Sequence, residues 1–257
     1  KYLNDLINRM HNGMIKVVTG IRRCGKSYLL FNIFKNYLLE QGVPASHIIM
    51  IELDQRKNKK YRDPDVILDY IESLIEEDGQ YYIMLDEVQM LQEFEEVLNS
   101  LLHIRNADVY VTGSNSKLMS SEISTYLTGR YVLIPVFTLS FKEYLDFKAN
   151  STLSRNELLE EYIRFGGFPI IAIGDYETQP AYQIVNGIYY TVVSRDIVKR
   201  HRINKQDLFD RVVKYIIENM GKTFSANSIS NFLKSEHRKI SVESIYNYLR
   251  WLEQAFI

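Results

Sequence analysis

The sequence has one cysteine among 257 residues, so no internal disulfide can form and a reducing compartment is the simplest interpretation. Its net charge of -1 excludes a global positive field that would hold nucleic acid nonspecifically, although a local basic patch stays open. No apolar run approaches the length of a membrane span, and no signal-peptide pattern opens the chain. The five histidines are isolated, and none has metal-ligand spacing. We therefore expect a cytoplasmic protein with no membrane partner.

Short apolar runs alternate with amphipathic stretches through the first two thirds of the chain. The runs predict β-strands at 15–19, 47–53, 81–85, 109–112 and 131–136. Apolar residues at helical spacing predict helices between them, at 28–39, 64–75 and 94–102. Because strands that alternate with helices form parallel sheets covered on both faces, the pattern predicts an α/β fold. Strand signals then fade, and helical patterns follow at 157–165, 182–200, 207–219, 226–234 and 242–254.

Residues 20–27, Gly-Ile-Arg-Arg-Cys-Gly-Lys-Ser, match the phosphate-binding pattern G-x-x-x-x-G-K-[ST] in full. The segment follows a predicted strand and opens a predicted helix, which is the context that the motif requires. Glycines let consecutive N–H groups point inward as an anion nest, and the helix presents its positive end to phosphates. We expect Lys26 to reach the β- and γ-phosphates and Ser27 to ligate Mg²⁺. The residues expected to bind the nucleotide are Gly20, Ile21, Arg22, Arg23, Cys24, Gly25, Lys26, Ser27 and Tyr28.

Two carboxylates, Asp86 and Glu87, follow the apolar run at 81–85. In P-loop enzymes an aspartate at this place holds Mg²⁺, directly or through water. A second carboxylate beside it can orient and deprotonate the attacking water. GTPases of the Ras type carry D-x-x-G here, whereas this chain has Asp-Glu-Val-Gln. The pair therefore favours ATP hydrolysis over GTP hydrolysis or a small-molecule kinase.

An N-K-x-D segment at 204–207 matches the guanine-reading motif of GTPases. In those proteins the motif closes an apolar strand, but here it follows the basic stretch 199–202. We interpret the match as coincidence, with Asn204 or Asp207 near a helix start. The nucleotide is accordingly expected to be ATP.

Two further polar positions are candidates for contact with the γ-phosphate or the lytic water. Ser114 and Asn115 follow the predicted strand at 109–112, and ligands bind beyond the carboxyl ends of parallel strands. A plain strand-ending turn explains the same residues equally well. Arg130 precedes the last predicted strand and carries a planar fork suited to phosphate oxygens. From this context alone, a solvated strand edge is the simpler interpretation of Arg130.

In combination, these segments resemble the prokaryotic AAA-type ATPases of the AAA+ superfamily that carry a C-terminal domain of unknown function. The resemblance covers nearly the whole chain. It rests on G-I-R-R-C-G-K-S, Y-I-M-L-D-E-V-Q, T-G-S-N-S, L-T-G-R, P-V-F-T-L-S-F-K-E-Y-L, Y-I-R-F-G-G-F-P, Y-T-V-V-S-R-D-I-V-K-R and F-S-A-N-S-I-S-N-F-L.

This resemblance implies a P-loop ATPase core at 1–148 and an all-helical lid at 149–203. It also implies a sensor residue at Ser114 or Asn115, and Arg130 as an arginine finger that acts on the nucleotide of a neighbouring subunit. A second sensor arginine in the lid has two candidates, Arg164 and Arg195. The C-terminal portion of the family normally runs beyond the last residue here, so the chain looks like a fragment.

The last three helical patterns, within 204–257, resemble a winged-helix module without its wing. The final helix would face DNA in such a module, but it is not basic. A basic cluster that could meet phosphates precedes it, formed by Lys234, His237, Arg238 and Lys239. A protein-interaction or lid-packing role is favoured over DNA binding.

Two functional hypotheses follow. In the first, the chain is a Mg²⁺-dependent ATPase whose metal ligands are Ser27 and Asp86. Its catalytic residues are Glu87, Lys26, Arg130, Ser114 and Asn115. In the second, it is an ATP-gated switch, with slow or no turnover, that presents its C-terminal module to DNA or protein. The protein client stays open in both.

Overall fold

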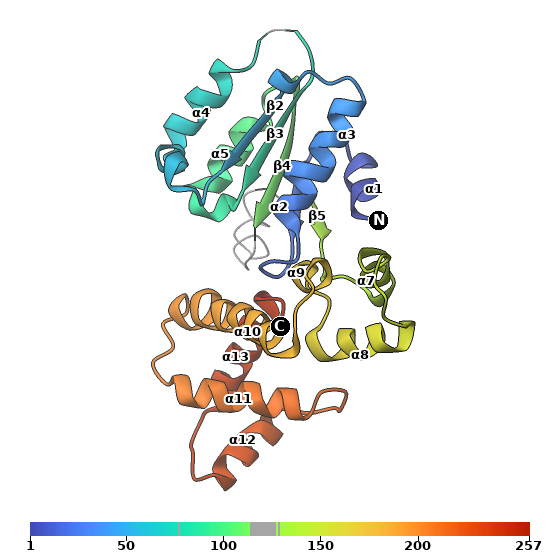
Figure 1. Cartoon of the computed structure of the whole chain (residues 1–257). Helices are drawn as coiled ribbons and strands as arrows, with labels where there is room; N and C mark the ends of the chain where they lie inside the picture. Colours follow the sequence, from blue (N-terminus) through green and yellow to red (C-terminus); the bar gives the residue numbers. More distant parts are fainter. Residues whose placement is uncertain (77, 114–126, 128) are drawn as a thin grey trace. The chain divides into compact units, whose positions relative to one another are not determined.

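The computed structural model describes residues 1–76, 78–113, 127 and 129–257 (Figure 1). The chain divides into two compact units, Lys1–Ala181 and Tyr182–Ile257. Within the described residues, no helix combines the length and the apolar character needed to cross a lipid bilayer. The three-part division predicted from the sequence, with boundaries at 148 and 203, stays a prediction.

The first unit contains a five-stranded parallel sheet, which confirms the predicted α/β class. Its strand order is β2-β3-β4-β1-β5. Every residue of β1 and β3 is buried, as expected for central strands covered on both faces. The strands are β1 (Ile15–Thr19), β2 (Ile48–Glu52), β3 (Tyr81–Asp86), β4 (Ala107–Gly113) and β5 (Tyr131–Pro135).

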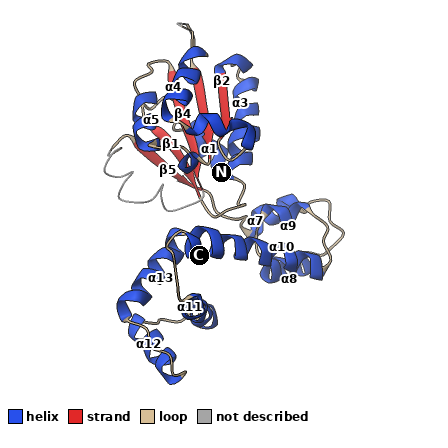
Figure 2. Cartoon of the chain, turned by 90° about the vertical axis from the view of Figure 1, so that its left-hand side faces the viewer, coloured by secondary structure: helices blue, strands red, loops and turns tan. Residues whose placement is uncertain are grey.

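Helices cover both faces of this sheet (Figure 2). One face is covered by α4 (Pro64–Ser73) and α5 (Phe94–Leu101), whose apolar sides join the core cluster of that face. The other face is covered by α1 (Tyr2–Ile7) and by a continuous helical segment. That segment runs through α2 (Lys26–Tyr28), the π-helical η1 (Leu29–Phe34) and α3 (Lys35–Glu40). Three short 3₁₀ turns complete this part: η2 (Ala45–His47), η3 (Arg56–Arg62) and η4 (Val88–Met90).

Three short helices complete the first unit: α7 (Phe141–Phe147), α8 (Arg155–Phe165) and α9 (Pro169–Ile173). Capping boxes begin α7 and α8, because a serine and the glutamate three residues later satisfy each other's backbone N–H groups. The helices share a small apolar cluster around Tyr144, Leu158 and Ala172.

The second unit is helical throughout. Its elements are the end of α10 (Thr178–Thr191), the π-helical η6 (Val192–Lys199), α11 (Gln206–Glu218), α12 (Ala226–Ser235) and α13 (Val242–Gln254). The last three helices pack on one another, with Phe209 edge-on to Tyr248 at 5.2 Å between ring centroids. The three predicted C-terminal helices are therefore present, while the winged-helix assignment stays a prediction.

Candidate functional site

The segment between β1 and α2 adopts a backbone that only particular residues permit. Gly20 has φ of 149°, and a Cβ placed there would lie 2.0 Å from the carbonyl oxygen of Val136. Arg23 and Gly25 also have positive φ, at 66° and 103°. This curled loop leads into the helical segment that begins at Lys26. Consecutive N–H groups in such a loop form an anion nest at the positive end of the helix.

The side chain of Lys26 lies against this loop. The residue is 4% exposed, and Nζ donates to the carbonyl oxygens of Gly20 at 2.9 Å and Ile21 at 3.0 Å. An ammonium group that is held among loop carbonyls is already positioned where the nest would receive phosphates.

Cys24 is buried in the same loop. Its Sγ donates to the carbonyl oxygen of Val136 at 3.3 Å, and burial raises the pKa of the thiol. A neutral, buried thiol is a poor nucleophile, so Cys24 fills space in the loop.

The loop and the carboxyl end of β3 meet through side chains. Ser27 Oγ donates to Asp86 Oδ1 at 2.8 Å, so the two expected metal ligands are in direct contact. Thr112 Oγ1, on the neighbouring strand β4, donates to the same carboxylate oxygen. Burial raises the pKa of Asp86, and the hydrogen bonds from Thr112 and Ser27 act in the opposite direction.

Glu87 follows Asp86 in a left-handed backbone conformation, with φ of 53° and ψ of 49°. A non-glycine residue pays about 1–2 kcal/mol in this region, which is accepted most often at functional sites. Its backbone N–H donates to Thr112 Oγ1 at 3.1 Å, and Gln89 Nε2 donates to its Oε2. Two contacts thus fix the glutamate beside the buried aspartate.

Sequence reasoning missed Thr112. Its hydroxyl joins the backbone of Glu87 to the carboxylate of Asp86, and the residue is completely buried. In the sequence, the feature that pointed to Thr112 was its hydroxyl side chain at the end of the apolar run 109–112. Its importance depends on β4 lying beside β3, which the sequence does not specify.

The structure places the other predicted site residues as follows. Ser114 and Asn115 lie outside the described residues. Gly113, directly before them, pairs with Thr19, directly before the P-loop. Arg164 is exposed on α8 in the first unit, and Arg195 is exposed on η6 in the second.

Arg130 directly precedes β5 and lies at the amino ends of the strands, whereas the P-loop follows the carboxyl end of β1. Its carbonyl oxygen accepts from the N–H of Ile15, the first residue of β1, at 2.9 Å. The P-loop follows the other end of that strand, about 16 Å away at roughly 3.3 Å per residue. Its guanidinium is exposed, and Nη1 donates to Asn99 Oδ1. Arg130 is therefore not part of the group of residues around the P-loop of its own chain.

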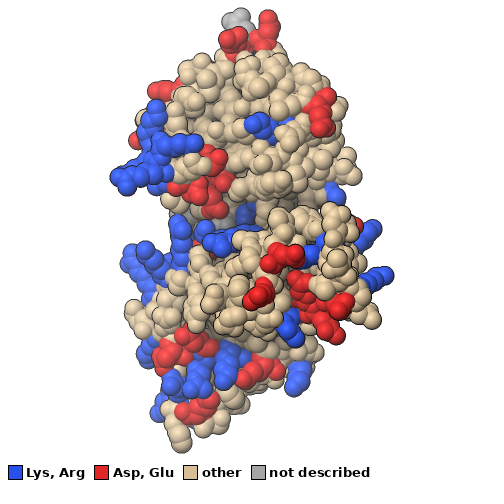
Figure 3. Space-filling model, in the orientation of Figure 1, with Lys and Arg blue, Asp and Glu red and all other residues tan. Residues whose placement is uncertain are grey.

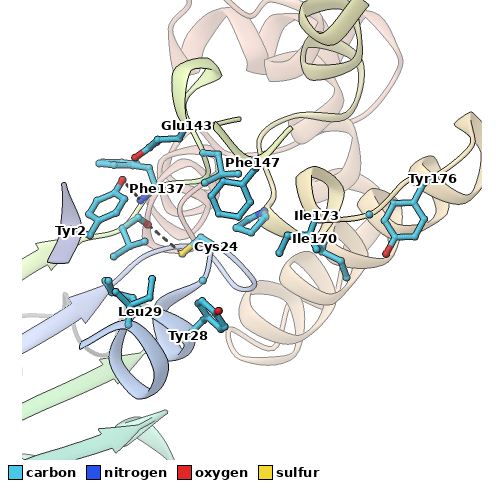
Figure 4. A pocket seen from close by; sticks show the side chains of 16 residues that line it. Tyr2, Cys24, Tyr28, Leu29, Phe137, Glu143, Phe147, Ile170, Ile173 and Tyr176 are labelled. Atoms are coloured by element: carbon cyan, nitrogen blue, oxygen red, sulfur yellow. Dashed lines mark hydrogen bonds between the residues drawn. The ribbon is translucent and has the colours of Figure 1, made fainter. Parts of the chain in front are cut away.

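An apolar pocket of about 570 Å³ borders the P-loop (Figure 4). Sequence reasoning did not find it, because its walls come from segments far apart in the chain. Glu143 is the one carboxylate among the described lining residues, and its Oε2 accepts from the N–H and Oγ of Ser140 at 2.9 and 2.7 Å. The lining includes Cys24, Gly25, Tyr28, Phe137, Phe147 and Ile170.

The N-K-x-D segment closes no strand, in agreement with its interpretation as coincidence. It leads into α11, whose N-cap is Lys205, within the all-helical second unit.

Comparison with known proteins agrees with this geometry. Residues 12–145 match the family model described as AAA domain, and residues 156–257 match a domain of unknown function. An uncharacterized protein of Haemophilus influenzae is 33% identical over 100% of this chain and 64% of its own length. An uncharacterized protein of Methanocaldococcus jannaschii is 33% identical over 98% of this chain and 57% of its own length. The chain thus spans 57% to 64% of the length of these two relatives.

Solved structures of low sequence identity are also similar. Caenorhabditis elegans PCH-2 aligns with a TM-score of 0.41 at 16% identity, over 95% of this chain and 61% of that one. Hsp104 of Saccharomyces cerevisiae, in a casein complex, aligns with a TM-score of 0.45 at 13% identity, over 99% and 48%. The assignment rests on the family match, which covers just over half of the residues and includes the P-loop and the Asp-Glu strand end. The chain belongs to the AAA domain family and is a nucleotide-binding protein of the AAA type.

Proposed function

We propose that the chain hydrolyses ATP in a Mg²⁺-dependent reaction. The observation that carries the proposal is the 2.8 Å contact between Ser27 Oγ and Asp86 Oδ1, which brings the P-loop to the acidic end of β3. A hydroxyl and one carboxylate suit Mg²⁺, which usually keeps several waters and takes its remaining oxygen ligands from substrate phosphates. Bound there, Mg²⁺ would neutralise charge on the β- and γ-phosphates.

Each residue around the loop has a role in this proposal. Lys26 binds the β- and γ-phosphates together with the N–H groups of the loop. Asp86 and Ser27 would supply oxygen ligands to the metal. Glu87 orients a water and accepts its proton. The hydroxyl of Thr112 holds the carboxylate of Asp86 and the backbone N–H of Glu87.

The apolar pocket is proposed to receive the adenine base. It borders Cys24 and Gly25 of the loop that would hold the phosphates, and aromatic side chains line it. Planar bases bind well in such apolar, partly preformed pockets. Glu143 is the one carboxylate among the described lining residues, and its Oε2 already caps α7. Tyr28→Ala should weaken ADP binding but leave the binding of inorganic pyrophosphate unchanged, as measured by calorimetry.

The central test compares phosphate release from ATP and from GTP with and without Mg²⁺. Glu87→Gln should retain ATP binding and lower turnover by about 10²–10⁴-fold. Glu93→Gln is a matched control, because Glu93 is another nearby glutamate with positive φ, at 48°. Equal turnover by the parent and Glu87→Gln would show that Glu87 is not the base. A parent that binds ATP but releases no phosphate would favour the ATP-gated switch instead.

We also propose that Arg130 completes the site of a neighbouring subunit. It lies at the amino ends of the strands, too far from the P-loop at their carboxyl ends to reach the nucleotide of its own chain. Arg130→Ala and Glu87→Gln should therefore each be inactive alone but recover activity when mixed, since a mixed assembly contains some intact interfaces. Asn99→Ala, which removes the partner of Arg130, should retain most activity. No recovery on mixing would exclude action between subunits.

A further inference from the structure

Four basic residues project from the turn that joins β2 to α4. Arg56, Lys57, Lys59 and Lys60 are all exposed, and they lie within five consecutive positions of η3. We call these four residues the cationic turn. Figure 3 shows Lys and Arg side chains gathered on this side of the first unit, in the region where Figure 1 draws the chain before α4. The basic cluster singled out from the sequence is a different one, in the second unit.

The backbone of η3, which carries the cationic turn, is held in place by the inward-facing residues of this element. Asn58 Nδ2 donates to the carbonyl oxygen of Glu52 at 2.9 Å. Arg62 donates to the carbonyl oxygens of Leu53 at 2.7 Å and Asp54 at 3.1 Å. The polar groups that could anchor the turn therefore point inward, and the four cations are left on the outside.

Tyr61 provides an apolar anchor for the same turn. Its ring stacks on Tyr70 of α4 at 4.5 Å between centroids, and both residues pack against the core of the sheet. The side chains that η3 exposes to solvent are therefore the charged ones, and its aromatic side chain is turned toward the core.

One of the four cations has an aromatic partner, because Lys60 Nζ lies 4.7 Å from the ring centroid of Tyr61. None of them forms an ion pair with a carboxylate of the described residues. Of the carboxylates that flank the turn, Asp63 caps α4 by accepting from the N–H groups of Asp65 and Val66. Like charges at neighbouring positions repel one another, so the turn is suited to an external polyanion that supplies several counter-charges at once.

The chain before the cationic turn and the chain after it are both hydrogen-bonded to the segment that carries Asp86 and Glu87. Directly after β2, three residues before Arg56, the N–H of Leu53 donates to the carbonyl oxygen of Asp86 at 3.1 Å. At the end of η3, the N–H of Gln92 donates to the carbonyl oxygen of Arg62 at 3.0 Å. A displacement of the turn would therefore be transmitted to the backbone on both sides of Glu87.

We propose that the cationic turn binds the phosphate backbone of nucleic acid and that this binding changes the rate of nucleotide hydrolysis. A nucleic acid fits because its affinity comes from regularly spaced charges and needs no apolar anchor. A protein partner would normally bury aromatic or aliphatic anchors. The coupling, though not the binding, rests on the proposed ATPase activity.

Binding is tested with a fluorescent single-stranded and a fluorescent duplex DNA, by anisotropy from 50 to 200 mM salt and without nucleotide. The turn variant is Lys57→Gln/Lys59→Gln/Lys60→Gln. The control variant removes three exposed lysines of the second unit and is Lys222→Gln/Lys234→Gln/Lys239→Gln. At about 0.7–0.9 per phosphate contact, the slope of log K against log salt should become shallower by about 2–3 in the turn variant. It should not change in the control.

Three results would overturn the binding proposal. The parent shows no salt-dependent binding at 50 mM salt, the turn variant keeps the slope of the parent, or the control variant loses binding as strongly as the turn variant. Poly-glutamate serves as an alternative polyanion. If it binds the parent as tightly as DNA and with the same dependence on the turn lysines, the turn recognises acidic protein and the nucleic-acid proposal is wrong.

Coupling is tested by measuring phosphate release from ATP with and without the same DNA. DNA should change the rate of phosphate release by the parent several-fold, and it should leave the rate of the turn variant unchanged. Without DNA, the two proteins should release phosphate at the same rate, because the three lysines are not among the residues around the P-loop. Equal DNA effects in parent and turn variant would refute the coupling. Binding of DNA without any phosphate release would leave the binding proposal intact and refute the ATPase proposal, so the two failures are distinguishable.

Discussion

The hydroxyl of Thr112 connects Asp86, the candidate metal ligand, to the backbone of Glu87, the candidate base. Replacing Thr112 measures how much this hydroxyl contributes to the stability of the fold. Thr112→Val keeps the shape of the side chain and removes its hydroxyl. The change deletes a hydrogen bond to the buried carboxylate of Asp86 and leaves the N–H of Glu87 without its acceptor. A bond to a charged group contributes about 1.5–3 kcal/mol, and an unsatisfied buried donor costs about 1–3 kcal/mol. Because the two effects overlap, we expect a loss of about 2–4 kcal/mol in the free energy of unfolding.

The pH dependence of this loss has a definite sign. The hydroxyl of Thr112 lowers the pKa of Asp86 against the larger, opposing effect of burial. Its stabilising effect on the ionised carboxylate is therefore present above the pKa of Asp86 and is lost as the pH falls through it. The difference between parent and Thr112→Val should shrink on acidification.

Urea unfolding followed by far-UV circular dichroism gives the free energies. Tryptophan fluorescence is unsuitable, because Trp251 lies in the second unit and reports on that unit. Thr112→Ser, which keeps the hydroxyl, is the matched control and should lose about 1 kcal/mol for its missing methyl group. A Thr112→Val protein within about 0.5 kcal/mol of the parent at neutral pH, or a serine variant as unstable as the valine variant, would refute the reasoning.

Three further substitutions give separate outcomes. Gly20→Ala should abolish binding of ATP measured by calorimetry, because its Cβ would lie 2.0 Å from the backbone oxygen of Val136. Asp86→Asn should abolish Mg²⁺-dependent turnover. It should leave the melting temperature at pH 7 equal to or above that of the parent, because burial disfavours the charged carboxylate and raises the pKa of Asp86, whereas a neutral amide has no charge to bury. This gain should vanish at low pH, where the carboxyl group is protonated in both states. Lys16→Met should cost about 3–5 kcal/mol in urea unfolding, because it leaves the buried carboxylate of Asp108 without its ammonium partner. Adding Asp108→Asn to Lys16→Met should recover part of that loss.

The features that the sequence predicted are those encoded over a few consecutive residues. The loop at 20–27 specifies its own curled backbone through Gly20 and Gly25, and the strand before it is an uninterrupted buried run. The Asp-Glu pair likewise follows a strand that is buried at all positions. Local patterns of this kind predicted a parallel α/β sheet and the residues that meet at its carboxyl edge.

The features that the sequence did not predict depend on contacts between distant segments. Thr112 matters because β4 lies beside β3, and the apolar pocket exists because segments as far apart as Tyr2 and Tyr176 line one cavity. That Arg130 lies at the opposite end of the strands from the P-loop follows only from the register of β5 with β1. No periodicity within a single segment carries this information.

The cationic turn shows how strand order can give a charge cluster a functional context. Residues 56–60 lie about thirty positions before Asp86 in the sequence, so their basic character alone would indicate a solvated surface. In the fold, β2 pairs with β3 so that Glu52 is opposite Asp86, and the turn that follows β2 begins beside the metal-ligand candidate. Had β2 been placed at the other edge of the sheet, beyond β5, the same charges would have no hydrogen-bonded connection to Glu87. The coupling proposed here is therefore a consequence of the β2-β3-β4-β1-β5 order, and a polyanion that binds the turn acts on the same backbone that positions the candidate base.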